Sequence, residues 1–128
     1  MPMRGVRGAT VASQDQSEAI LITTRELLLA ILEANPDMRT EDISSALFSV
    51  TGDLTSEYPA RAARELGWDQ VPLMCTLEIP VPNALPRCIR VLLHWNTELP
   101  QSAIRHVYLG EASRLRPDLS RREPGGSS

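Results

Sequence analysis

Apolar residues recur along this chain at two spacings, and the wider one predicts a long amphipathic helix. From Ile20 to Leu32 they stand three, four or seven positions apart, which places them on one face of a helix. Ser13 and Gln16 have the spacing of a capping box and predict where this helix begins. Pro36 predicts its end, because the residue before a proline avoids helical geometry.

Shorter apolar segments, separated by turn residues, predict strands. A second helix is predicted from Pro59 to Leu66, since proline suits a first turn and Gly67 can end the last one. A single capped turn is expected at residues 40–42. The predicted strands are Met3–Thr10, Ser45–Val50, Val71–Ile79, Cys88–Trp95 and Ile104–Leu109, and the segment Gly110–Leu115 is predicted to form a short helix.

Length and charge narrow the class of protein. A chain of 128 residues and 14.1 kDa fits one domain whose core needs no disulfide or metal. The net charge of −3 and the pI near 5.4 disfavour nucleic acid as the main partner, because phosphate binding needs a concentrated cationic surface. All 13 basic residues are arginine, so Schiff-base chemistry and a P-loop are excluded.

No segment predicts a membrane span or a signal peptide. The longest apolar run, Leu27 to Leu32, is far shorter than the ~20 residues that a span requires. Residues 1–8 lack the apolar stretch of a signal peptide. We therefore expect a cytoplasmic protein that does not interact with membranes.

Metal and nucleophile motifs are missing. Cys75 and Cys88 form no CxxC pair, and His94 and His106 are twelve positions apart, outside any helical zinc pattern. There is no GxSxG elbow and no glycine-rich phosphate loop. The sequence therefore predicts neither a metal nor a cofactor.

The arginine at position 90 is the strongest chemical signal. Alternation along its strand points Arg90 to one side and Ile89 and Val91 to the other. A charge in such a strand needs an acidic partner or an anionic ligand. Glu78, the only acid between Asp69 and Glu98, is the first candidate partner. A clamp for a carboxylate or phosphate is the second reading, because the guanidinium fork suits such anions.

Other conspicuous residues have ordinary structural readings. Tyr108 is typical of a core tyrosine whose hydroxyl is hydrogen-bonded, and a cysteine such as Cys75 is typical of a small buried hydrophobe. His106 is interpreted as structural. Arg61 and Arg64, three positions apart, are typical of a solvated helix face.

Six segments together resemble the monofunctional, AroH-type bacterial chorismate mutases. The resemblance runs from about Met3 to Leu119, and the combination is far more specific than any one motif. The segments are Met3–Thr10, Tyr58–Leu66, Val71–Glu78, Cys88–Val91, Ile104–Leu109 and Leu115–Leu119. The resemblance implies an α+β fold, a mixed β-sheet packed by helices, assembled as a trimeric pseudo-α/β-barrel.

The resemblance also implies an enzyme. The family converts chorismate to prephenate, an intramolecular Claisen rearrangement on the way to phenylalanine and tyrosine. This reaction needs no nucleophile, metal, cofactor or proton transfer, which agrees with the missing motifs. Catalysis then consists of holding the reactive conformer of a dianion and stabilising the charge that separates as its ether bond breaks.

Site residues follow from the resemblance, position by position. Arg90 should place its guanidinium on the ether oxygen and on a substrate carboxylate. Arg7 and Tyr108 should bind carboxylate, Glu78 should accept a hydrogen bond from the ring hydroxyl, and Cys75 should contact the same hydroxyl region. The remaining residues expected to contact substrate are Tyr58, Ala60, Arg61, Arg64, Leu73, Met74, Thr76, Leu77, Leu115 and Arg116.

Strict alternation would put Cys75 and Glu78 on opposite faces of one strand, so we expect a bulge or a strand end between them. Two positions depart from the family pattern: Arg61 stands where lysine is common, and Tyr58 where phenylalanine is common.

The expected assembly is a homotrimer with chorismate sites between subunits. One domain should span residues 1–119, and the polar segment 120–128 should be disordered. Two other functions stay open: a non-catalytic trimer that binds small carboxylates, and a structural oligomer whose arginines are tied up in salt bridges.

Overall fold

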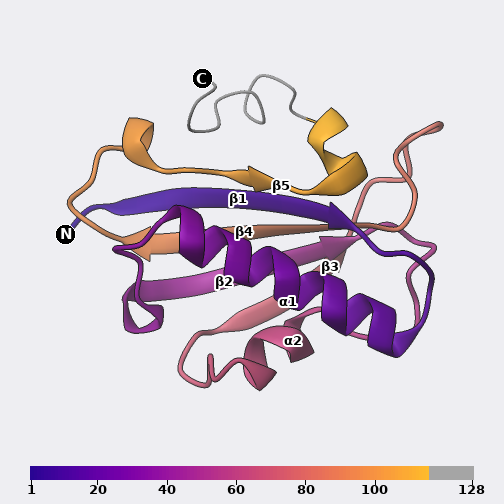
Figure 1. Cartoon of the computed structure of the whole chain (residues 1–128), viewed down its shortest axis with the longest axis horizontal. Coiled ribbons are helices and arrows are strands. Elements are labelled where there is room, and N and C mark those ends of the chain that lie inside the picture. The colour runs from indigo at the N-terminus through magenta and orange to yellow at the C-terminus, as the bar shows by residue number, and fades with distance from the viewer. Residues whose placement is uncertain (116–128) are drawn as a thin grey trace.

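Five strands form one mixed sheet, with the order β3-β2-β4-β1-β5 (Figure 1). The computed structural model describes residues 1–115. The strands are β1 Met3–Val11, β2 Ile43–Val50, β3 Leu73–Leu77, β4 Cys88–Asn96 and β5 Val107–Tyr108. The two longest strands, β1 and β4, therefore lie side by side inside the sheet, and the two shortest form its edges.

Strand direction changes on either side of the central pair. Strand β4 runs antiparallel to both β1 and β2, whereas β3 joins β2 in parallel and β5 joins β1 in parallel. In this register Arg90 lies between Ala9 of β1 and Ser49 of β2. The register thus places Arg90 in the middle of the sheet.

Helices α1 (Ser17–Ala34) and α2 (Ala60–Glu65) cover one face of the sheet (Figure 1). The core lies between these helices and the sheet, and its largest members are fully buried. Gly8 lets α1 approach β1, because a Cβ there would lie only 2.7 Å from Ile31 Cδ1. The core side chains include Val6, Leu27, Leu28, Ile31, Phe48, Trp68, Leu93 and Trp95.

The opposite face of the sheet carries Arg7 and Arg90. Alternation that buries Ile89, Val91 and Leu93 against the helices turns Arg90 to the other side, as predicted. Arg7, between Val6 and Gly8, turns the same way. The α+β prediction is confirmed.

One helix start was predicted wrongly. Helix α1 begins at Ser17 with Gln16 as its N-cap, and no side chain caps it. The capping box of Ser13 and Gln16 does not form, because the preceding loop is held elsewhere: Asp15 accepts hydrogen bonds from the backbone amides of Thr55 and Ser56, at 2.9 and 3.1 Å.

Two strands are shorter than predicted. Strand β3 begins after Pro72, which has no amide proton, and ends at Leu77, which pairs with Val50, the last residue of β2. Strand β5 begins only at Val107, because the Asn35 side chain occupies both backbone groups of Arg105, at 3.0 and 2.9 Å. The other predicted elements are present, with Gly67 at φ +92° after α2 and a 3-10 helix, η3, at Gly110–Arg114.

Two expectations cannot be placed in the structure: Arg116 and the segment 120–128 lie outside the described residues. Within residues 1–115, none of the helices has the length and apolar character needed to traverse a membrane.

Candidate active site

A pocket of about 350 Å³ opens on the sheet face that turns away from α1. Strands β1, β2 and β4 form its floor, and the chain that leaves β3 forms one wall. Its polar side chains are Arg7, Ser49, Thr76, Glu78, Arg90 and Tyr108. Five of these six, all but Ser49, were predicted as site residues, although they come from four separate segments of the chain.

Arg90 and Glu78 form an ion pair in this pocket. Arg90 Nε lies 3.5 Å from Glu78 Oε2, and the same carboxylate oxygen accepts a hydrogen bond from the Ser49 hydroxyl. Glu78 reaches this position because its amide still donates to Val50 O, at 2.9 Å, one residue beyond β3. The ion-pair reading of Arg90 is therefore confirmed. The Arg90 side chain nevertheless stays 45% exposed toward the pocket, so a ligand can reach it.

Arg7 and Tyr108 come from adjacent strands. Tyr108 pairs with Ala9 in the parallel ladder between β5 and β1. The amide of Arg7 donates to His106 Nδ1, at 3.0 Å. This pairing brings two side chains that can donate hydrogen bonds to a carboxylate into the lining of the same pocket.

Ser49 was missed in the sequence, although one signal was there. Ser45, Leu47 and Ser49 alternate with the buried residues Ala46 and Phe48, which marks Ser49 as a polar position on the non-helical face. The sequence does not reveal that β2 pairs with β4, and without that register Ser49 cannot be placed beside Arg90.

Cys75 lies away from this pocket, on the opposite face of the sheet. It pairs with Phe48 in a regular ladder and packs, half-buried, against the core under the helices. Of the two features expected between Cys75 and Glu78, a bulge or the end of the strand, the structure has the second: β3 runs regularly to Leu77 and ends there. Cys75 and Glu78 therefore keep the opposite faces that alternation gives them.

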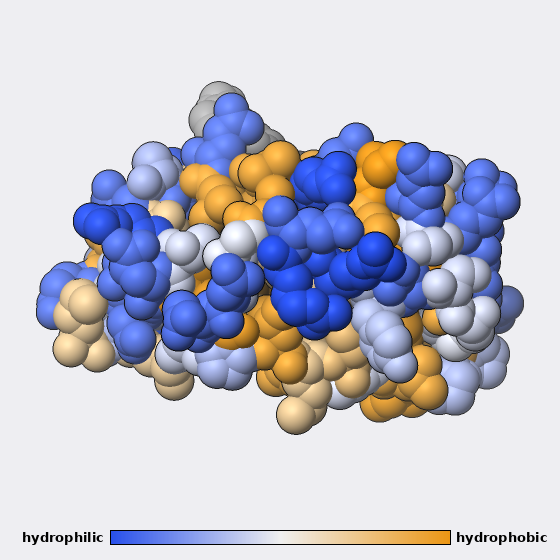
Figure 2. All heavy atoms as spheres, turned by 90° about the horizontal axis from the view of Figure 1, so that it is seen from below, coloured by the Kyte–Doolittle hydropathy of each residue, from blue (hydrophilic) through white to orange (hydrophobic). Residues whose placement is uncertain are grey.

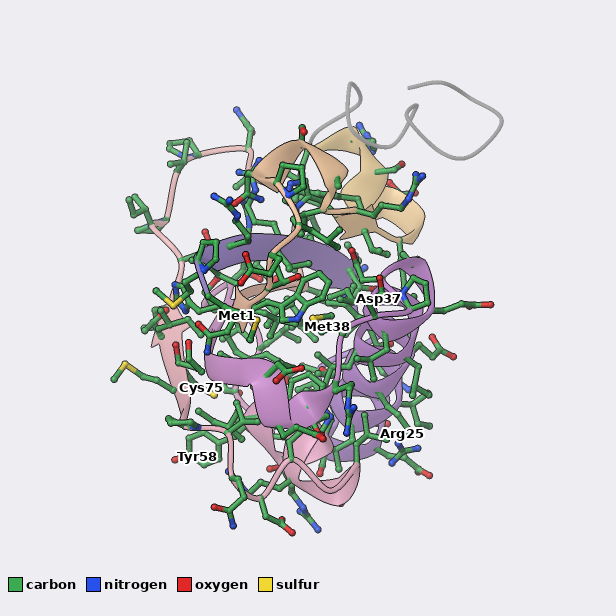
Figure 3. All side chains as sticks on the ribbon, turned by 90° about the vertical axis from the view of Figure 1, so that its left-hand side faces the viewer. Met1, Arg25, Asp37, Met38, Tyr58 and Cys75 are labelled. Atoms are coloured by element: carbon green, nitrogen blue, oxygen red, sulfur yellow. The ribbon has the colours of Figure 1, made fainter. Side chains whose placement is uncertain are left out.

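The other predicted contact residues within the described part of the chain divide into four groups. Thr76 and Leu77 line the pocket. Ala60 is buried in the core and Leu73 packs against it. Four residues are exposed outside the pocket: Tyr58, Arg61, Arg64 and Met74. Leu115 follows η3 and is half-buried. Figure 3 shows Tyr58 and Cys75 on the side of the molecule opposite Arg25 of α1.

Arg61 is held by two acids, one before α2 and one at its end. Its guanidinium lies 3.0 Å from Glu57 Oε1 and 3.3 Å from Glu65 Oε2. Glu57 in turn accepts from the Ser17 hydroxyl, the main reason why its pKa is lowered, and then from the Tyr58 amide. The helix face of Arg61 is thus fixed to the start of α1.

The edge formed by β3 carries an unusual number of exposed apolar side chains. Five of these side chains are between 58% and 78% exposed: Tyr58, Met74, Leu77, Ile79 and Val81. Viewed from the side of α2 and β3, apolar side chains reach the surface between polar ones (Figure 2). An exposed apolar patch on a sheet edge marks a surface that another chain can cover.

The Cys88 thiol lies buried behind the pocket. Burial raises the pKa of the Cys88 thiol, and the Arg90 charge offsets only part of that effect. Cys88 is therefore a neutral thiol at neutral pH. Among residues 1–115 no group of three His, Cys, Asp or Glu side chains is arranged to hold a metal ion.

Two arginines, a tyrosine hydroxyl and a carboxylate in one pocket define a site for a small organic anion that also carries a hydroxyl group. The fold and this site together are those of a small-molecule enzyme or binding protein of the α+β class.

Comparisons with known proteins give the family. The family model for chorismate mutase type I matches residues 3–119. This chain belongs to that family.

The chain is 56% identical to chorismate mutase AroH of Thermus thermophilus over 117 residues, which cover 91% of this chain and 96% of the relative. It is 47% identical to chorismate mutase AroH of Bacillus subtilis (strain 168) over 121 residues, 94% of each chain. A solved chorismate mutase from Clostridium thermocellum has a TM-score of 0.83 and 43% identity, covering 86% of this chain and 97% of that chain.

Proposed function

We propose that this chain rearranges chorismate to prephenate in a homotrimer whose active sites lie between subunits, with Arg90 acting on the breaking ether bond. The chain is a chorismate mutase, an isomerase of aromatic amino acid biosynthesis. The observation that carries the proposal is the meeting of Arg7, Glu78, Arg90 and Tyr108 in one pocket. Their charges match a dianion that carries a ring hydroxyl.

Each side chain has a role in the proposed mechanism. Arg7 and Tyr108 hold carboxylate and fix the reactive conformer. Arg90 bridges a carboxylate and the ether oxygen, where negative charge builds as the C–O bond breaks. Glu78 accepts from the ring hydroxyl and faces the positive charge that spreads over the ring. No proton changes place, so none of these groups has to titrate during turnover.

The ion pair of Arg90 and Glu78 supports this division of roles. At 3.5 Å it is a loose pair, and the Ser49 hydroxyl gives Glu78 a second partner. Arg90 can therefore turn its guanidinium to the ether oxygen while Ser49 still holds the carboxylate. A tight buried pair would resist that exchange, because separating buried charges is costly.

The proposal of a shared site rests on two observations. The pocket is open to solvent on one side of a single subunit, whereas Tyr58, Arg61, Arg64 and Met74 are exposed outside it. The apolar edge along β3 is also uncovered. A neighbouring subunit that covers this edge would bring one subunit's pocket against residues of the other, and a closed ring of three satisfies every edge.

The test is a turnover assay on the purified protein with light scattering at the assay concentration. We expect loss of chorismate absorbance and a mass of three chains. Binding without turnover would favour the carboxylate-binding protein, and no thermal shift with chorismate would favour the structural oligomer. A fully active monomer would contradict the shared site. The cytoplasmic location and the lack of a nucleic-acid partner stay predictions.

A further inference from the structure

The outer edge of β1 is completed by side chains before strand β5 begins. Strand β5 pairs only with Gly8 and Ala9. At the residue just before Gly8, the amide of Arg7 donates instead to His106 Nδ1, at 3.0 Å. Here the imidazole takes the place that a strand carbonyl would otherwise occupy. Because Nδ1 accepts, the proton of the neutral ring sits on Nε2.

The backbone that carries His106 is fixed from the helix layer. Asn35, only 4% exposed at the end of α1, donates to Arg105 O at 2.9 Å and accepts from Arg105 N at 3.0 Å. A chain of contacts therefore runs from the end of α1 through Arg105 and His106 to Arg7. The ring is held at a set position rather than on a free loop.

We propose that His106 is a positioning residue that sets Arg7 relative to Tyr108 in the pocket. The inference rests on the proposed function, since it assumes that Arg7 binds a substrate carboxylate. His106 does not line the pocket, whereas Arg7 and Tyr108 both do. His106 therefore acts through the Arg7 backbone on one side and through its own chain, two residues before Tyr108, on the other.

The same edge offers a matched control. Gln101 accepts from Gly5 N at 3.0 Å and donates to Gly5 O at 2.7 Å. It thus completes the β1 edge two residues before Arg7, with two hydrogen bonds instead of one. Gly5 has no side chain to bring into the pocket. Loss of Gln101 therefore tests whether any weakening of this edge affects the reaction.

The experiment measures kcat and KM for chorismate, with thermal unfolding, in the wild type, His106→Leu, His106→Asn and Gln101→Leu. Asparagine offers an oxygen near the Nδ1 position and nothing where Nε2 was, so it isolates the acceptor. One net hydrogen bond corresponds to about a 3–10-fold change. We expect His106→Leu to raise KM by about that factor with kcat changed far less, because a carboxylate contact acts in both ground and transition state.

His106→Asn should recover most of the wild-type KM. Gln101→Leu should lower the unfolding temperature at least as much as His106→Leu and leave KM and kcat unchanged. Equal kinetic losses in His106→Leu and Gln101→Leu, or no recovery of KM in His106→Asn, would overturn the positioning role. The proposed function would still stand in that case, because it depends only on turnover by the wild type. A wild type without turnover would overturn both.

Discussion

Replacing Gly8 with alanine tests the packing that sets the sheet against α1. An added Cβ would lie 2.7 Å from Ile31 Cδ1, 3.1 Å from Leu27 Cδ1 and 3.2 Å from Val107 O. Overpacking of this kind costs about 1–3 kcal/mol. Alanine restricts the unfolded chain and returns about 0.4–1 kcal/mol. We therefore expect Gly8→Ala to lower the free energy of unfolding by about 1–2 kcal/mol.

The nearest contact can be removed separately, because Ile31→Val deletes the Cδ1 atom and leaves the rest of the side chain. Alone, Ile31→Val should cost about 0.5–1.5 kcal/mol. Combined with Gly8→Ala it should cost less than the sum, with a coupling of about 1 kcal/mol, since the new methyl takes the vacated space. Leu27 and Val107 stay in place, so the relief is partial.

Urea unfolding at one protein concentration measures all three variants, because the stability of an oligomer depends on concentration. Gly5→Ala is the control on the same strand: its Cβ would meet only Leu92 Cδ1, at 3.7 Å, an ordinary contact. It should be neutral or slightly stabilising. Strictly additive effects of Gly8→Ala and Ile31→Val, or equal losses from Gly5→Ala and Gly8→Ala, would refute the packing argument.

Two further predictions concern pH and metals. The pKa of Asp15 is lowered from its ordinary value of 3.8, chiefly by the hydrogen bond from the Thr55 amide. The ionised carboxylate therefore stabilises the folded protein above pH 3.8, and this stabilisation is lost as the pH falls through the lower pKa of the folded state. The urea midpoint should therefore fall more between pH 7 and pH 3 in the wild type than in Asp15→Asn, and equal falls would contradict this. Turnover should be nearly constant through neutral pH and unaffected by a chelator, because the proposed mechanism requires neither a change of protonation nor a metal. A steep slope of rate against pH, or loss of rate in chelator, would contradict that mechanism.

Much of the fold could be predicted because its signals are local. The periodicity of Ile20 to Leu32, the proline after it and the alternation around Arg90 each reflect chemistry within one element. The errors lie where distant segments decide the outcome. The capping box failed because Asp15 contacts Thr55 and Ser56, forty residues away in the chain. Strand β5 is short because Asn35 occupies the backbone of Arg105.

The site divides in the same way. Glu78 as the first partner of Arg90 could be predicted from the charges, and the structure joins the two. The other members of the pocket, Arg7 and Tyr108, were expected only through the family resemblance, because nothing local shows that β1 pairs with β4 and β5. Ser49 was missed for want of the same register. Cys75 was expected near Glu78, yet alternation without a bulge keeps it on the helix side.

The central claim is that Arg90 stabilises the charge on the breaking ether bond. The direct measurement is kcat at saturating chorismate for Arg90→Gln and Arg90→Lys. Arg4→Gln is the control for loss of one arginine from the same sheet, since Arg4 Nε donates to Leu99 O, at 2.8 Å, outside the pocket.

Removing one positioned donor costs about 10²–10³ in kcat. Losing a full charge should therefore cost Arg90→Gln at least about 10³. Lysine should restore little, because a point charge cannot reach ether oxygen and carboxylate together. Arg4→Gln should keep the wild-type kcat. If Arg90→Gln, with its fold shown intact by circular dichroism, keeps most of the wild-type kcat and loses only affinity, Arg90 is a carboxylate anchor and the electrostatic mechanism is wrong.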